Sequence, residues 1–164
     1  MGRNGSVILR TLVAFFLAAG VGYVIATLFF TSANLIRLSA VGADIAASDA
    51  WRTLLFDLRG MMPTPTTWTN YGSLIFIGFG IAFSVAALLR LAASRSPSWR
   101  HLTPYLFPAA GATAIAVILL AMYPKYEVFM IAGARGIWGS AAQCVAGAIA
   151  GYLFQVSLKR EARS

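Results

Sequence analysis

The chain has 164 residues, the length of a single domain, and its composition is that of an integral membrane protein. Hydrophobic residues make up 59% of the chain and charged residues only 11%, and the mean hydropathy is +0.76. A formal net charge of +8 is compatible with nucleic-acid binding. The basic residues, however, flank apolar segments instead of forming a patch interleaved with aromatic side chains. Composition therefore predicts one membrane domain over residues 1–164 and argues against a nucleic-acid partner.

Long stretches without Asp, Glu, Lys or Arg indicate helices that cross a bilayer, because a crossing takes about 20 helical residues. We expect four transmembrane helices, at about residues 7–34, 71–93, 103–123 and 130–158. The first follows Arg3 and Arg10 as a secretory signal would, but its apolar stretch is longer than that of a signal, so we expect it to be uncleaved. The expected fold is all-α, a bundle of four transmembrane helices.

The loop after the first helix has the pattern of a short amphipathic helix, expected at about residues 48–60. Its apolar residues recur at i, i+3, i+4 and i+7 and so share one side of the helix: Trp51, Leu54, Leu55 and Leu58. The charged residues are expected opposite: Asp49, Arg52, Asp57 and Arg59. Such a helix could lie flat on the outer leaflet, or it could cover the mouth of the bundle and dock a partner.

The distribution of basic residues predicts the orientation. With a cytoplasmic N-terminus, four crossings bring the C-terminus back to the same side, where only Glu161 opposes the basic residues: Arg3, Arg10, Arg90, Arg95, Arg100, Lys159, Arg160 and Arg163. The outer segments are nearly balanced, with Arg37, Arg52, Arg59, Lys125 and Arg135 against Asp44, Asp49, Asp57 and Glu127. The positive-inside rule therefore predicts an N-in/C-in topology, and the compact form fits a bacterial inner (plasma) membrane.

Arg135 stands at the start of the fourth apolar segment and has two interpretations. The uncharged run 136–158 spans the core by itself, which makes Arg135 an anchor whose side chain reaches the lipid headgroups. If the helix begins directly after residue 127, Arg135 lies about two turns deep and needs a counter-ion, for which Glu127, Asp57 and Asp49 are candidates. An outer vestibule near Arg135 and Glu127 could then accept an anionic headgroup or substrate.

Small residues form two neighbouring rows on the fourth helix, which contain the expected helix-packing residues Gly136, Ser140, Gly147 and Gly151. Lipid provides no hydrophobic drive for helix association, so close approach over small residues is a main source of packing energy. Matching rows occur on the first helix, at Ala14, Ala18, Gly22 and Ala26, and on the second, at Gly78, Ala82 and Ala86.

Gln143 interrupts one of these rows within the bilayer. An unpaired amide in hydrocarbon costs several kcal/mol, so Gln143 must find a partner. A backbone or hydroxyl group of a neighbouring helix is one candidate, and a ligand or a second subunit is the other.

The sequence contains no recognisable catalytic, cofactor or metal motif. His101 is the single histidine, and no Ser/His/Asp set, P-loop or paired acids are found. The four spans also lack the ionisable residue on which proton-coupled transporters depend. We therefore expect a non-enzymatic accessory or scaffold subunit, without cofactor or metal, that packs in the lipid bilayer through its glycine-rich face against itself or other membrane subunits. The alternative is a small permease or lipid-handling protein that uses the vestibule near Arg135 and Glu127.

Overall fold

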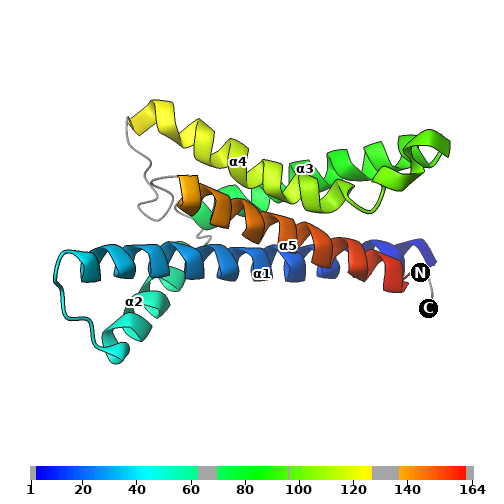
Figure 1. Cartoon of the computed structure of the whole chain (residues 1–164). Coiled ribbons are helices and arrows are strands. Elements are labelled where there is room, and N and C mark those ends of the chain that lie inside the picture. The colour runs from blue at the N-terminus through cyan, green and yellow to red at the C-terminus, as the bar shows by residue number, and fades with distance from the viewer. Residues whose placement is uncertain (1–2, 63–69, 96, 127–136, 162–164) are drawn as a thin grey trace.

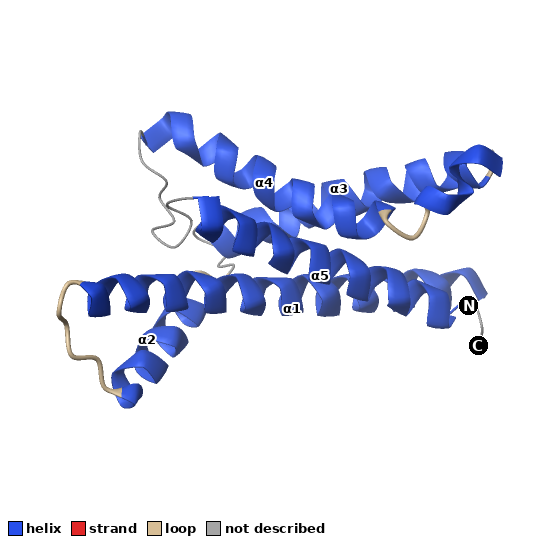
Figure 2. Cartoon of the chain, viewed as in Figure 1, coloured by secondary structure: helices blue, strands red, loops and turns tan. Residues whose placement is uncertain are grey.

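The computed structural model describes residues 3–62, 70–95, 97–126 and 137–161, and over these residues the chain is entirely helical (Figures 1 and 2). The elements in chain order are α1 (Arg3–Ala40), α2 (Ala47–Gly60), α3 (Tyr71–Ser94), the short 3₁₀ helix η1 (Pro97–Leu102), α4 (Leu106–Tyr126) and α5 (Ile137–Glu161). Three of them, α1, α3 and α5, are long and apolar enough to cross a membrane. In α4 the apolar stretch is shorter, Leu106–Ala121.

The start of α3 agrees with the prediction, whereas the end of α1 and the start of α4 depart from it. α3 begins at Tyr71 as expected, and Asn70 caps it by accepting a hydrogen bond from the backbone N–H of Ser73 at 2.9 Å. α1 continues to Ala40, beyond the expected end near residue 34. α4 starts at Leu106 instead of residue 103, because the Thr103 hydroxyl donates to the Arg100 carbonyl and closes a turn after η1.

The four long helices pack so that α5 lies between α1 and α4, while α3 lies against α4. α1 and α3 make few direct contacts, which leaves an open seam on that side of the bundle. After α1 the chain turns at Gly42, whose φ of 89° is accessible to glycine without strain, and α2 folds back toward α1 (Figure 1). The first turns of α1 and the last turns of α5 lie at the same end.

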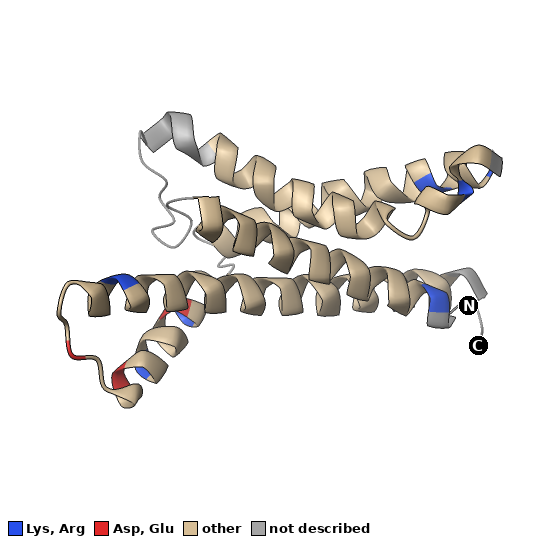
Figure 3. Ribbon diagram, in the orientation of Figure 1, with Lys and Arg blue, Asp and Glu red and all other residues tan. Residues whose placement is uncertain are grey.

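Charged residues gather at the ends of the helices, and the middle of the bundle carries none among the described residues (Figure 3). Among the residues that Figure 3 colours by charge, the acidic ones lie at the end formed by α1 and α2, and the opposite end carries Lys and Arg. Placing the charged residues at the ends is what a membrane-spanning bundle requires, because a charge in the hydrocarbon core is costly.

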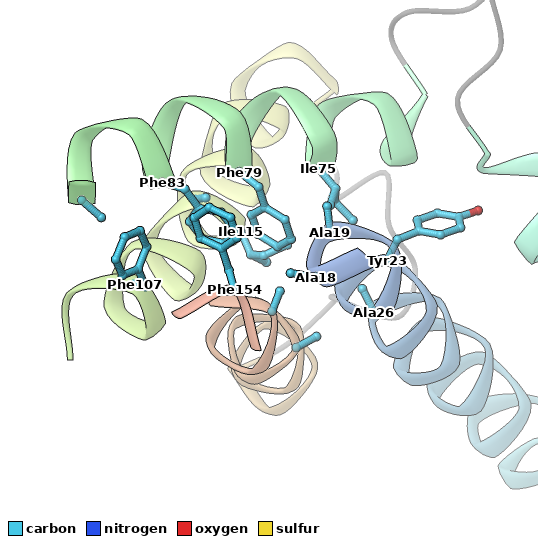
Figure 4. Close-up of a cluster of buried hydrophobic side chains, with 14 of the residues drawn as sticks. Ala18, Ala19, Tyr23, Ala26, Ile75, Phe79, Phe83, Phe107, Ile115 and Phe154 are labelled. Atoms are coloured by element: carbon cyan, nitrogen blue, oxygen red, sulfur yellow. The ribbon is translucent and has the colours of Figure 1, made fainter. Parts of the chain in front are cut away.

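The core is built from aromatic rings on all four long helices, to which α1 adds small residues (Figure 4). Phe83 of α3 stacks on Phe79 and on Phe154 of α5, with ring centroids 5.2 and 5.0 Å apart, and Phe107 of α4 meets Phe154 edge-on at 5.4 Å. Such ring pairs contribute about 0.5–1.5 kcal/mol each beyond the burial of their area. The contribution of α1 to this core includes alanines: Ala14, Ala18, Ala19 and Ala26.

Candidate functional site

The glycine face of α5 is occupied by α4 of the same chain. A Cβ atom on Gly147 would overlap the carbonyl oxygen of Gly111 and lie 2.8 Å from Ile115 Cγ1. A Cβ on Gly151 would overlap the carbonyl of Phe107. The two helices therefore touch backbone to backbone, an approach that only glycine permits. Because this face is filled within the chain, it is not available to a partner helix.

The other expected packing residues divide between described and undescribed parts of the chain. Ser140 is half-buried near the start of α5, and Gly136 lies outside the described residues. The row on α1 meets a different side of α5 from the glycine face: a Cβ on Gly22 would lie 2.7 Å from the Cβ of Ala150. α5 thus uses one small-residue side for α4 and another for α1. Gly111, the partner of Gly147, was not predicted, although it stands in the small-residue stretch "PAAGATAIA".

Gln143 is fully buried and links three helices. The Tyr71 hydroxyl of α3 donates to Gln143 Oε1 at 2.9 Å, and Gln143 Nε2 donates to the Ala26 carbonyl of α1 at 3.0 Å. Both groups of the amide therefore have partners inside the bundle, which is how a polar side chain is stabilised in lipid. Neighbouring helices, through one hydroxyl and one backbone carbonyl, provide the partners that the sequence required.

Two hydrogen bonds hold the end of α2 against α1. The Tyr23 hydroxyl donates to the Leu58 carbonyl at 2.6 Å, and the Thr31 hydroxyl donates to Asp57 Oδ2 at 2.7 Å. Asp57 was a candidate counter-ion for Arg135, and in the structure its carboxylate is engaged by Thr31. The other members of the expected vestibule, Arg135 and Glu127, lie outside the described residues. Of the candidate site residues, the structure thus describes Asp57 and Gln143, and each is bonded within the bundle.

The apolar stripe of α2 divides between two environments. Leu54 and Leu58 are half-buried on the side toward the bundle, while Trp51 and Leu55 are exposed by 60% and 43%. Phe56 is 76% exposed, and it lies nearly opposite Leu54 because two residues turn a helix by about 200°. α2 therefore presents aromatic and aliphatic surface away from the bundle.

Among the described residues no group of three His, Cys, Asp or Glu side chains is placed to hold a metal ion. Comparison with known protein families, curated proteins and solved structures gives no significant match. Function must therefore be argued from the geometry of the chain.

Proposed function

We propose that this chain is an accessory or scaffold subunit of a bacterial inner-membrane complex, with four spans in an N-in/C-in topology, and that it docks another membrane protein through α2. The observation that carries the proposal is the bare apolar surface of α2, formed by Trp51, Leu55 and Phe56. Hydrogen bonds from Tyr23 and Thr31 fix this helix at the end of the bundle. A rigid helix with exposed aromatic side chains is typical of an interface.

Contact with the bilayer alone accounts less well for this surface. A helix that rests on a leaflet buries one face and turns its polar face to water. In α2, however, Leu54 lies toward the bundle and Phe56 on nearly the opposite side, so apolar side chains lie on two sides of the helix. A protein partner covers a surface of this shape better than a flat leaflet does.

The internal contacts favour this role over the permease alternative. In a permease, Gln143 and Asp57 would line the transport pathway and bind the substrate. Both side chains are instead hydrogen-bonded to neighbouring helices. Arg135 and Glu127 remain the residues that the alternative would use. Since the glycine face of α5 is filled by α4, the surface for association is assigned to α2 and not to Gly147 and Gly151.

Photo-crosslinking in native membranes tests the docking surface. A photoreactive amino acid at Phe56 should form a discrete crosslink to another protein, and the same group at Leu54, on the bundle-facing side, should not. Phe56→Ser should lose the co-purifying protein while the thermal stability of the isolated chain stays unchanged, because Phe56 is largely exposed. Crosslinks to lipid alone at Phe56 would show that α2 rests on the leaflet and would contradict the proposal.

The topology is tested separately with fused reporters. Reporters placed after Arg95 and after Arg163 should both report cytoplasm, and a reporter near Ala47 should report the outside, because the basic residues concentrate at one end of the bundle. A cytoplasmic signal at Ala47 would reverse the orientation. If the reporters after Arg95 and after Arg163 report opposite sides, the chain crosses the membrane an odd number of times between them, and the expected count of four spans is wrong.

A further inference from the structure

The seam between α1 and α3 contains a groove of about 810 Å³. Its walls are apolar and come from both helices, with Phe16 and Val24 on α1 and Phe76 and Ile77 on α3. Gly20 of α1 also lines the groove, and nothing lies within 4 Å of the position that a Cβ would take there. The groove exists because α1 packs on α5 and α3 packs on α4, so these two helices are held near each other with little direct contact.

One wall of the groove contains a serine with an unpartnered hydroxyl. Ser73 lines the groove from the first turn of α3, is only 4% exposed, and its Oγ has no hydrogen-bond partner among the described residues. Serines in helices commonly donate to the carbonyl four residues earlier, as Ser84 does to Gly80 and Ser157 does to Leu153. A buried hydroxyl that lacks such a bond is unfavourable. Ser73 therefore leaves an unsatisfied donor in the wall of the groove.

Arg59 adds a positive charge to the same lining. It belongs to the last turn of α2, is exposed, and is the one charged residue among the described residues that line the groove. The neighbouring carboxylate, Asp57, accepts from Thr31, and within the described part of the chain no ion pair to Arg59 is found. Its guanidinium is thus free to bind an anion, for which its planar donors are well suited.

The charged end of the groove lies toward the outer side of the membrane. Tyr23 and Thr31, which hold the end of α2, lie about 20 and 31 Å from Arg10 along α1, counted at the helical rise per residue. A hydrocarbon core is about 30 Å thick, so with Arg10 at its inner boundary the end of α2 lies in the outer half of the core, where the long side chain of Arg59 can extend toward the headgroups. Ser73, in the first turn of α3, and the apolar walls belong to the same groove.

We propose that the α1–α3 groove binds one anionic phospholipid of the outer leaflet. Its phosphate pairs with Arg59, and an acyl chain lies along Phe16, Val24 and Ile77. The charge of the lining selects an anionic headgroup over a zwitterionic one. The assignment to the outer leaflet rests on the orientation proposed above, whereas the site itself does not depend on the partner proposed for α2.

Lipid retention by the purified full-length chain tests the proposal. The two lipids compared have the same acyl chains and are added to the protein in detergent. The wild-type protein should retain phosphatidylglycerol about fivefold better than phosphatidylcholine, the preference expected for one arginine near the headgroups. Arg59→Gln should abolish the preference, while Arg52→Gln, a control on the same helix outside the groove lining, should keep it. Equal retention of the two lipids by the wild-type protein, or an unchanged preference in Arg59→Gln, would overturn the charge assignment.

Two further measurements locate the acyl chain. Gly20→Leu would fill the groove and should lower retention of both lipids. Photoreactive-chain phosphatidylglycerol should label peptides that contain residues 16–24 and 76–77 of the wild-type protein, which requires no variant to fold. Unlabelled phosphatidylglycerol should compete for this labelling, and phosphatidylcholine should compete about fivefold less well. Labelling spread evenly over all the lipid-facing helices would show annular lipid only and would overturn the site.

Discussion

A single methyl group at Gly111 should weaken the bundle. Gly111 of α4 faces Gly147 of α5, and a Cβ added to Gly111 would overlap the Gly147 carbonyl oxygen and lie 2.8 Å from its carbonyl carbon. Carbon atoms in contact normally lie about 3.5–4.0 Å apart, so α4 and α5 would have to separate by roughly 1 Å. The atoms in the way belong to the backbone, which cannot rotate aside as a side chain can.

The cost can be isolated with a matched substitution. Overpacking of this kind costs about 1–3 kcal/mol, while replacing glycine by alanine within a helix favours folding by up to about 1 kcal/mol. Gly80→Ala in α3 gains the same helix propensity without the clash, because its Cβ would meet only Phe15 Cζ at 3.9 Å. The difference between Gly111→Ala and Gly80→Ala therefore cancels the propensity and should be about 1–3 kcal/mol.

The measurement is the free energy of unfolding in mixed micelles, from titration with a denaturing detergent followed by far-ultraviolet circular dichroism. Gly147→Ala should behave like Gly111→Ala, since it places a Cβ against the Gly111 carbonyl. If Gly111→Ala proves as stable as Gly80→Ala, α4 and α5 do not approach through their backbones, and the packing described above is wrong.

Three further substitutions test other contacts. Tyr71→Phe leaves Gln143 Oε1 without its donor and should lower the free energy of unfolding by about 0.6–2 kcal/mol, with no additional loss from Tyr71→Phe in a Gln143→Leu background. Thr31→Val removes the hydroxyl that holds Asp57 and should speed hydrogen exchange in α2 but not in α5, whereas equal exchange in both proteins would show that this bond does not hold the helix. Arg135→Lys should leave stability and recovery of the native complex unchanged if Arg135 is a headgroup anchor, and a marked loss would support the vestibule.

The sequence by itself determined that α1, α3 and α5 are long and apolar enough to span a membrane, whereas α4, the remaining expected span, has a shorter apolar stretch. This property depends on the transfer of each residue from water to lipid and on the length of the run, both of which can be read along the chain. The amphipathic helix was also predicted within a residue of its start at Ala47, because its periodicity and the glycine at its end are local features. That Gln143 needs a partner followed from its place in an apolar run.

Only the tertiary structure decided which surfaces meet. The small residues of α5 were expected to face α1, α3 or a partner, yet Gly147 and Gly151 lie against α4, while Gly22 of α1 meets Ala150 on another side. Helices with small residues on several sides have several pairings open to them, and loop lengths and the fit of the phenylalanine core select among these. The partners of Gln143 depend on this pairing, because the hydrogen bonds join groups far apart in the chain. The unbonded hydroxyl of Ser73 also depends on it, because the packing of the helices decides which groups surround this side chain.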